Sequence, residues 1–175
     1  MPSSSPDLFG ITGWKNSGKT TLVVKLVEEF IARGVVVSTV KHAHDGFDID
    51  HEGTDSYRHR YAGAHETAIV SNNQFALMHQ RQTGGAAPSL ERIITKLAPC
   101  DLVLVEGFKT HPLPKIECLR KDSAKEQAIW HSNKHVVALA TDHTIADCPL
   151  PQFELSDVGT IADYIGQKIG LHTLR

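Results

Sequence analysis

The segment Gly13-Trp14-Lys15-Asn16-Ser17-Gly18-Lys19-Thr20 constrains the fold of this chain more than any other stretch. It matches the pattern G-x-x-x-x-G-K-[ST], which is typical of loops that bind nucleotide phosphates. An apolar run at 8–12 precedes it, and apolar residues recur at helical spacing over 22–31 before Gly34. A strand that leads in and a helix that leads out are the context that such a loop needs. The sequence therefore predicts a phosphate-binding loop between the first strand and the first helix.

The residue types in this loop each suit a phosphate ligand. Gly13 and Gly18 permit backbone angles that a side chain disfavours. The amides from Asn16 to Thr20 can then converge on a phosphate at the helix N-terminus, where the helix dipole favours an anion. Lys19 is expected to reach the β and γ phosphates as a catalytic residue, Thr20 to ligate Mg²⁺, and Thr21 to contact the α phosphate. A chance match in a glycine turn is the alternative reading.

A β-branched run at 35–40 follows the first helix and predicts a second strand parallel to the first. It ends at Lys41 and His42, which we expect on the same rim as the phosphate loop, because ligands bind at the carboxyl ends of parallel strands. Asp48 and Asp50 follow in an acidic loop at 43–53 and are candidate Mg²⁺ ligands; a solvated loop explains them equally well. The histidines of this loop match no zinc pattern, and hydrogen bonds explain them at least as well as a transition metal.

The next segment predicts a short helix and a hairpin. Thr54 can cap a helix over 55–61, with Asp55 in its first turn. Two apolar runs at 67–70 and 75–78 are separated by only four polar residues, so they form an antiparallel pair. We expect this hairpin, at about 66–79, to extend the edge of the parallel sheet. An exposed edge invites pairing with a second copy, so the sequence favours a homodimer.

Further strands are predicted at 101–105, 115–119 and 135–140, with a short one at 153–155. Glu106 ends the first of these strands and is followed by Gly107. In phosphate-loop proteins, a carboxylate at this position orients the ligands of Mg²⁺ or the attacking water. The alternative is that Glu106 is a surface carboxylate or a helix cap. The strand at 115–119 alternates only partly, so one of its faces is expected to be less buried. A loop is expected at 81–88. The helix that follows it is expected to be capped and to turn four apolar side chains inward, those of Leu90, Ile93, Ile94 and Leu97. A last helix, capped by Ser156 or Asp157, is expected to close the chain.

Thr141 and Asp142 end the last central strand and are candidate base-reading residues. A carboxylate can accept both the N1–H and the exocyclic amine of guanine, whereas adenine has no donor at N1. Asp142 is therefore our candidate for guanine recognition. Asp is also a common opener of a loop after a strand, and that reading stays open.

Composition limits the class of protein. A chain of 175 residues with 41% apolar and 22% charged residues fits one α/β domain over 1–175, with a loose polar leader at 1–6. The formal net charge of −2 gives no reason to expect nucleic acid or an anionic membrane as partner. No apolar run is long enough to span a bilayer, and three widely separated cysteines suit a reducing cytoplasm. We therefore expect a cytoplasmic α/β phosphate-loop NTPase with a mostly parallel central sheet flanked by helices.

Several separated blocks resemble the molybdopterin-guanine dinucleotide biosynthesis adaptor proteins of the MobB type. Beside the phosphate loop through Thr21, they are Val40-Lys41-His42-Ala43-His44, Asp48-Ile49-Asp50, Gly53-Thr54-Asp55-Ser56-Tyr57-Arg58, Ala62-Gly63-Ala64 and Leu104-Val105-Glu106-Gly107-Phe108-Lys109. The phosphate loop is shared by a vast superfamily, and the combination of the other blocks is far more specific. The resemblance covers the chain from about Leu8 to Asp142.

The resemblance implies a function that composition does not show. It implies a dimeric, GTP-binding and feebly hydrolytic adaptor that assists the enzyme joining GMP to molybdenum-bound molybdopterin. Molybdopterin guanylyltransferase and the molybdenum-insertion enzyme are the partners it implies. It also implies that Gly13 to Thr21 hold the triphosphate and that Thr20 and Glu106 serve Mg²⁺. Lys41, His42, Asp48, Asp50 and Asp55 would line the mouth of the site.

An enzyme is the competing hypothesis, either a GTPase that drives metal insertion or a small-molecule kinase or ligase of the same fold. A fast hydrolase needs a residue that positions water and a cationic finger. Only Lys15, Lys41 and Arg58 suggest themselves as the cation. The sequence therefore favours the adaptor, at most a slow Mg²⁺-dependent GTPase.

Overall fold

The computed structural model describes residues 5–43, 46–80, 87–123 and 127–171. The chain divides into two compact units, residues 1–42 with 97–175 and residues 43–96. Each unit is described by itself. The assignment of 1–175 to one domain stays a prediction, and the leader at 1–4 and the loop at 81–86 lie outside the described residues. None of the described helices is both long and apolar enough to cross a membrane.

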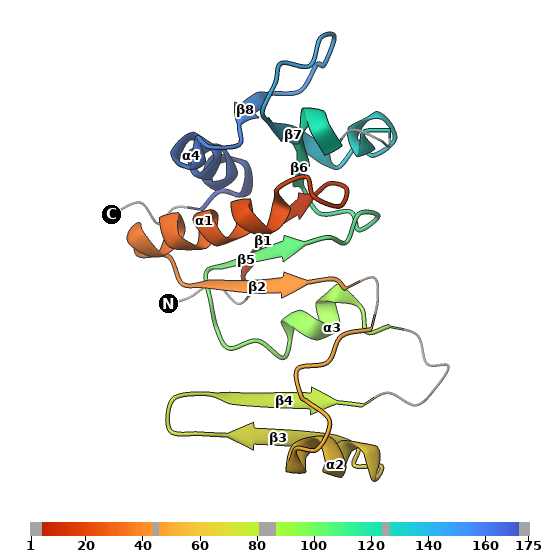
Figure 1. The fold of residues 1–175 in the computed structure, drawn as a ribbon. Coiled ribbons are helices and arrows are strands. Elements are labelled where there is room, and N and C mark those ends of the chain that lie inside the picture. Colours follow the sequence, from red (N-terminus) through yellow and green to blue (C-terminus); the bar gives the residue numbers. More distant parts are fainter. Residues whose placement is uncertain (1–4, 44–45, 81–86, 124–126, 172–175) are drawn as a thin grey trace. The chain divides into compact units, whose positions relative to one another are not determined.

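The first unit is built on a six-stranded sheet in the order β2-β5-β1-β6-β7-β8, in which every neighbouring pair is parallel (Figure 1). Its strands are β1 (Asp7–Thr12), β2 (Val37–Lys41), β5 (Leu102–Glu106), β6 (Lys115–Leu119), β7 (Val136–Thr141) and β8 (Gln152–Glu154). The predicted mostly parallel α/β fold is confirmed. Because all strands run the same way, their carboxyl ends form a single edge, where such sheets bind ligands.

Helices α1 (Lys19–Ala32) and α4 (Val158–Ile169) pack side by side, and Arg33 joins them through Glu29 and Asp163 (Figure 1). The carboxylate of Asp157, one of the two predicted caps, accepts the Thr160 amide at the start of α4. The largest core cluster contains apolar side chains from both helices and from the central strands; Phe9, Ile11, Leu26, Leu104 and Ile161 are fully buried in it. This core fixes α1 against β1, and so fixes the loop between them.

A second cluster of apolar side chains surrounds Leu139 and includes Trp14 and Ile129. Two short 3₁₀ turns, η1 (Lys121–Ser123) and η2 (Ile129–His131), lie between β6 and β7 in sequence.

The prediction for β6 was wrong in one respect, because all five of its residues are buried. Lys115 and Glu117 are 0% exposed, although charged side chains are rarely buried unless they are paired. The reason is that Lys115 donates to backbone carbonyls of the loop after β5 and Glu117 accepts backbone amides of η2, so burial leaves neither group without a partner.

The second unit contains α2 (Asp55–Tyr61), β3 (Glu66–Val70), β4 (Phe75–His79) and α3 (Leu90–Ile94). The Thr54 hydroxyl accepts the Tyr57 amide, as the predicted cap of α2, and Ser89 caps α3 in the same way through Arg92. Of the residues predicted to face inward from this helix, Leu90 is buried and Ile93 and Ile94 are half-buried. Leu97 is also half-buried, but it lies beyond the end of α3 and belongs to the first unit.

The hairpin itself is confirmed, with Thr67 opposite Met78 and Val70 opposite Phe75. The prediction that the hairpin extends the edge of the large sheet was wrong. Among the described residues, β3 and β4 form a two-stranded sheet of their own. One face of this hairpin is apolar and exposed, with Val70 and Phe75 each 75% exposed and Leu77 54% exposed. Successive strand residues point to opposite faces, so the buried Thr67 and Met78 belong to the other face.

Candidate functional site

The loop between β1 and α1 has the backbone angles that are expected at the two glycines of its motif. Gly13 has φ 140° and Gly18 has φ 95°, a range that side chains disfavour. A Cβ on Gly13 would lie 2.5 Å from the Ser17 hydroxyl oxygen and 2.6 Å from the Cys118 carbonyl oxygen. The loop is therefore wound too tightly at Gly13 for any other residue. Lys15 and Asn16 are exposed at its tip, while Ser17 is buried below it.

Lys19 lies at the first turn of α1, with its side chain turned back over the loop. Its Nζ donates a hydrogen bond to the Trp14 carbonyl oxygen at 2.6 Å. Burial lowers the pKa of Lys19, and the nearby carboxylate of Glu106 opposes this shift. An ammonium held beside the loop at the start of a helix is suited to a polyanion such as a nucleotide phosphate.

Thr20 and Glu106 come together although they are 86 residues apart in the chain. The Thr20 hydroxyl donates to the Glu106 carboxylate at 3.1 Å, and the Lys41 ammonium lies 3.7 Å from the same oxygen. Glu106 ends β5, which lies between β1 and β2, so the register of the sheet brings it beside Ile11 and Lys41. The predicted pairing of the loop with this carboxylate is therefore present in the structure.

The neighbours of Glu106 at the rim are fixed by backbone contacts. The Gly107 amide donates to the Ile11 carbonyl, and the His42 amide donates to the Glu106 carbonyl. The His42 ring lies 4.8 Å from the Phe108 ring, measured between centroids. Lys41, His42 and Gly107 thus lie on the same edge of the sheet as the phosphate loop, as expected.

Oxygen ligands suit Mg²⁺, and the Thr20 hydroxyl and Glu106 carboxylate supply two of them within hydrogen-bonding distance of each other. The residues therefore fit the predicted ion. Thr20 and Glu106 would hold it, and Mg²⁺ would neutralise charge on phosphate oxygens. In the described part of the chain, no group of three or more His, Cys, Asp or Glu side chains is placed to hold a metal ion.

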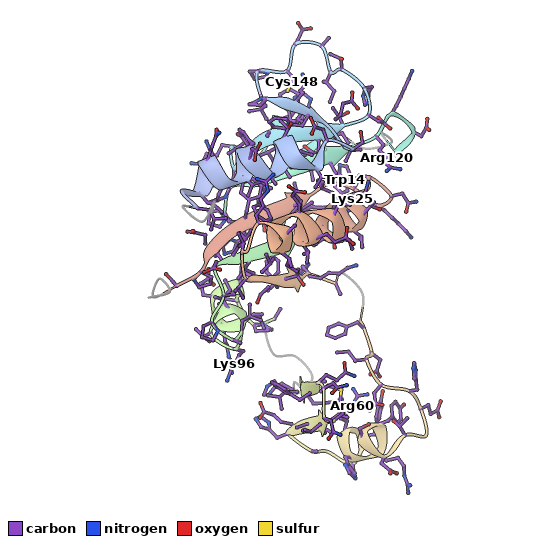
Figure 2. The ribbon with its side chains drawn as sticks, turned by 90° about the vertical axis from the view of Figure 1, so that its left-hand side faces the viewer. Trp14, Lys25, Arg60, Lys96, Arg120 and Cys148 are labelled. Atoms are coloured by element: carbon purple, nitrogen blue, oxygen red, sulfur yellow. The ribbon has the colours of Figure 1, made fainter. Side chains whose placement is uncertain are left out.

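Arg120 is a residue that the sequence analysis missed. It follows β6 directly, and its guanidinium lies 3.2 Å from where a Cβ on Gly18 would be. Together with five residues of the loop and helix start, it lines a cavity of about 310 Å³; the others are Asn16, Gly18, Lys19, Thr20 and Thr21. Figure 2 labels Arg120 and Trp14. In the sequence, Arg120 is marked only by its position directly after a buried strand. That position points to the phosphate loop only once the strand order is known, because β6 lies next to β1.

Thr141 and Asp142 end β7, which lies next to β6. Thr141 is buried, and the Asp142 Oδ1 atom accepts the Lys121 amide at 3.0 Å and lies 2.9 Å from His143 Nδ1. The contact with His143 and the amide of Lys121 lower the pKa of the Asp142 carboxyl group. Both contacts are to one oxygen of an exposed carboxylate, which is anionic and held in a fixed orientation. Its role in reading guanine stays a prediction.

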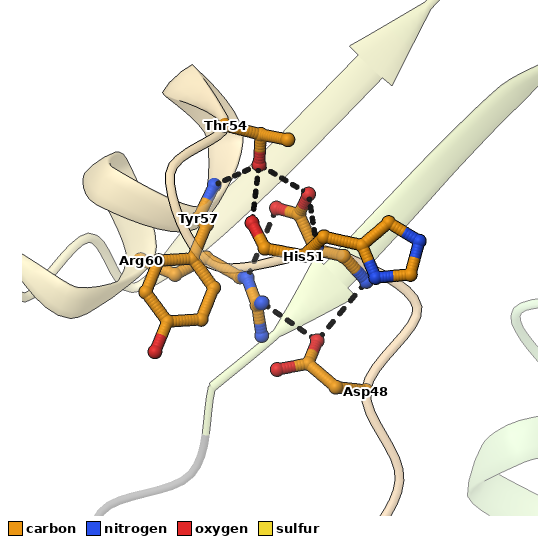
Figure 3. A network of polar contacts seen from close by, with 6 residues as sticks. Asp48, His51, Thr54, Tyr57 and Arg60 are labelled. Carbon is orange, nitrogen blue, oxygen red and sulfur yellow. Dashed lines mark hydrogen bonds and ion pairs between the residues drawn. The ribbon is translucent and has the colours of Figure 1, made fainter.

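Asp48, Asp50 and Asp55 belong to the second unit, and there Asp48 and Asp50 converge on one cation. Arg60 donates to Asp48 at 2.7 Å, and its Nε lies 3.7 Å from Asp50 Oδ2 (Figure 3). The Thr54 hydroxyl donates to Asp50 at 2.6 Å, and this bond lowers the pKa of the Asp50 carboxyl group.

Arg60 is itself 8% exposed, and its guanidinium lies 5.6 Å from the centre of the Tyr57 ring. The network therefore ties the segment before α2 to the helix. Asp55 is outside it and lies 3.9 Å from Arg58 at the surface. The assignment of these three carboxylates to the mouth of the nucleotide site or to Mg²⁺ remains a prediction.

Comparison with known proteins identifies the family. Residues 8–142 match the family model MobB, described as molybdopterin guanine dinucleotide synthesis protein B. The chain belongs to the MobB family. The matched region contains the phosphate loop, Glu106, Arg120 and Asp142, so it includes the whole rim described above.

Relatives of known name agree with this assignment. The molybdopterin-guanine dinucleotide biosynthesis adapter protein of Haemophilus influenzae is 36% identical over 162 residues, covering 90% of this chain and 86% of that protein. The adapter protein of the same name from Escherichia coli is 32% identical and covers 90% of both chains. The crystal structure of Bacillus subtilis MobB superposes with a TM-score of 0.70 at 26% identity, covering 93% of this chain and 98% of that one. The resemblance seen in the sequence blocks is confirmed.

Proposed function

We propose that this protein is a GTP-binding adaptor of molybdenum cofactor biosynthesis, which assists the attachment of GMP to molybdopterin. Membership of the MobB family supports the pathway. The observation that carries the nucleotide part is the contact between Thr20 and Glu106 at the mouth of the phosphate loop. It joins the two groups that serve Mg²⁺ to the loop whose amides and Lys19 suit a triphosphate.

In this proposal Gly13 to Thr21 cradle the triphosphate, and Arg120 adds a positive charge on the far side of Gly18. Thr20 and Glu106 hold Mg²⁺ against the phosphates. Asp142 accepts the two donors on the edge of guanine, and this makes GTP the preferred nucleotide over ATP. Hydrolysis is slow, because an adaptor needs the bound nucleotide to persist while a partner is engaged.

The partners we propose are molybdopterin guanylyltransferase, the molybdenum-insertion enzyme and a second copy of this chain. The exposed apolar face of the hairpin, with Val70, Phe75 and Leu77, supports the homodimer, because exposed apolar patches of this kind mark protein interfaces. We propose a cytoplasmic location, where the cofactor enzymes and GTP are found together.

Calorimetric titration of the chain with GTP, ATP and GDP, each with and without Mg²⁺, tests the nucleotide part. We expect tighter binding of GTP than of ATP and strengthening by Mg²⁺. Lys19→Ala should weaken GTP binding at least a hundredfold while circular dichroism stays unchanged, because the ammonium that meets the phosphates is lost. The exposed Lys168→Gln on α4 is the matched control. Equal GTP affinity in Lys19→Ala and the wild type would refute the site.

A further inference from the structure

A second cavity, of about 880 Å³, lies in the first unit beside the phosphate loop. It shares no lining residue with the cavity at Lys19. Its lining includes Trp14, Lys109, Ile129, Asn133, Lys134 and His135. The proposed function uses none of their side chains except that of Trp14, a variable position of the phosphate-loop motif.

Two buried charged residues on β6, Lys115 and Glu117, hold two segments of the lining of this cavity, one around Lys109 and one around Ile129. The Lys115 ammonium donates to the carbonyl oxygens of Phe108, Lys109 and His111, at 3.1, 2.9 and 2.6 Å. The Glu117 carboxylate accepts the amides of Ile129 and Trp130, each at 2.8 Å. Both side chains are fully buried, and burying a charged group is costly unless hydrogen bonds compensate it.

A direct bond joins the two segments, because the Asn133 side-chain amide donates to the Lys109 carbonyl at 2.6 Å. The lining is thus held by six hydrogen bonds from three side chains. A cavity fixed in this way is pre-organised, which lowers the entropic cost of binding a ligand.

The lining combines cations with apolar surface. Lys109 and Lys134 supply two ammonium groups, and His135 supplies an imidazole ring. Ala128 and Ile129 supply apolar surface, and the Lys109 Nζ lies 3.4 Å from the centre of the Trp14 ring. Such a lining suits a ligand with a flat, largely apolar ring and an anionic group, because each part then meets its complement.

Trp14 connects this cavity to the phosphate loop. Its indole donates to the Gln127 carbonyl at 2.9 Å, on the side of the second cavity, while its backbone carbonyl accepts from Lys19. An ammonium that turns toward a triphosphate weakens its bond to the Trp14 carbonyl. Trp14 thus contacts both the ammonium of the phosphate loop and the backbone at the second cavity, and any coupling that it carries between the two would act in both directions.

We propose that this cavity is a binding site for a flat heterocyclic anion of the pterin class, separate from the nucleotide site and coupled to it through Trp14. The choice of a pterin over other aromatic anions rests on the proposed function. A site for the acceptor beside a site for the nucleotide would let the adaptor present both to a partner enzyme.

The test is a calorimetric titration of the full chain with pterin-6-carboxylate, with and without saturating GTP and Mg²⁺. We expect one molecule to bind in both conditions, with an affinity that changes at least threefold when GTP is present. Lys109→Gln and Lys134→Gln should each weaken pterin binding at least fivefold and leave GTP affinity within twofold. Lys168→Gln, an exposed lysine on α4, is the control and should change neither.

Three results would overturn the proposal: no pterin binding by a chain that binds GTP, pterin binding that GTP displaces, or binding that neither lysine variant weakens. Guanosine monophosphate is titrated into the GTP-saturated chain as a further arm. If it binds with the same dependence on Lys109, the cavity is a nucleotide site and the pterin assignment fails. Pterin binding by a chain that binds no GTP would instead refute the proposed function and leave the second site standing.

Discussion

The hydroxyl of Thr20 and the carboxylate of Glu106 lie 3.1 Å apart at the carboxyl edge of the parallel sheet. One belongs to the start of α1 and the other to the end of β5, and the pairing of β1 with β5 brings them together. This contact places a carboxylate directly beside the threonine of the phosphate loop. The chemistry proposed for the site depends on it, because Mg²⁺ needs oxygen ligands close to the phosphates.

Glu106→Gln should remove most of the effect of Mg²⁺ on GTP binding. The amide keeps the size of the side chain and removes its charge, so we expect Mg²⁺ to strengthen binding about tenfold less than in the wild type, or about 1.4 kcal/mol. The measurement is calorimetric titration with GTP in the presence and absence of Mg²⁺. Glu154→Gln, at the exposed end of β8, is the matched control. An undiminished Mg²⁺ effect in Glu106→Gln would exclude Glu106 from the ion site.

Arg120→Gln should weaken GTP binding about fivefold to twentyfold without altering the fold. The guanidinium lies beside Gly18 and lines the cavity with Lys19, so its loss removes a positive charge next to the phosphates. The difference between variant and wild type should shrink at high salt, because screening weakens the same interaction. Lys121→Gln, the exposed cation next in the chain, should have little effect. Equal losses in both variants would mean that Arg120 acts only through general charge.

Phe75→Glu should convert the proposed homodimer into a monomer at micromolar concentration. Phe75 is 75% exposed on the apolar face of the hairpin, and a charge there would be buried without a partner in a dimer. Sedimentation velocity measures the change directly. Ile31→Glu, on the exposed side of α1, introduces the same charge elsewhere and should leave the dimer intact. A wild-type chain that sediments as a monomer would count against the hairpin dimer.

Lys115 should make the free energy of unfolding depend on pH above neutrality. Burial lowers the pKa of Lys115 to about 8, whereas an unfolded lysine titrates near about 10.4. Between these values the unfolded chain holds a proton that the folded chain has released, so stability rises with pH through this window. We expect wild type to gain on the order of 2 kcal/mol relative to Lys115→Met between pH 8 and pH 10.

Urea unfolding of both proteins at several pH values provides the measurement, and the other lysines cancel in the difference. If Lys115→Met does not fold, the Lys115 ε-carbon resonance of the wild type can be titrated instead. A midpoint above about 10 would show that the three carbonyl acceptors fully offset the effect of burial.

Local sequence patterns were sufficient to predict structural features that depend on one short segment. The loop between the first strand and the first helix, the cap of α2 at Thr54 and the hairpin pairing were predicted correctly, because each depends on residues within a few positions of one another. The family blocks were also local, and residues 8–142 match the MobB model as the sequence suggested.

Predictions failed where the outcome depended on contacts between distant segments. The partial alternation of β6 suggested one less buried face, but Lys115 and Glu117 are buried because loops on either side supply their hydrogen bonds. Arg120 was missed for a related reason, since its place beside Gly18 follows from β6 lying next to β1.

The phosphate-loop motif, the strand and helix that flank it, and the family can all be inferred from the order of the residues alone. Glycine angles, capping side chains and apolar spacing act over a few residues, so they can be read along the chain. Three contacts depend on the folded chain: Arg120 lies beside Gly18 of the loop, Thr20 meets Glu106, and buried Lys115 and Glu117 hold the lining of a second cavity. Strand order explains the difference: β1, β5 and β6 are neighbours in the sheet but distant in the chain, so the residues at and after their carboxyl ends come together only when the sheet forms.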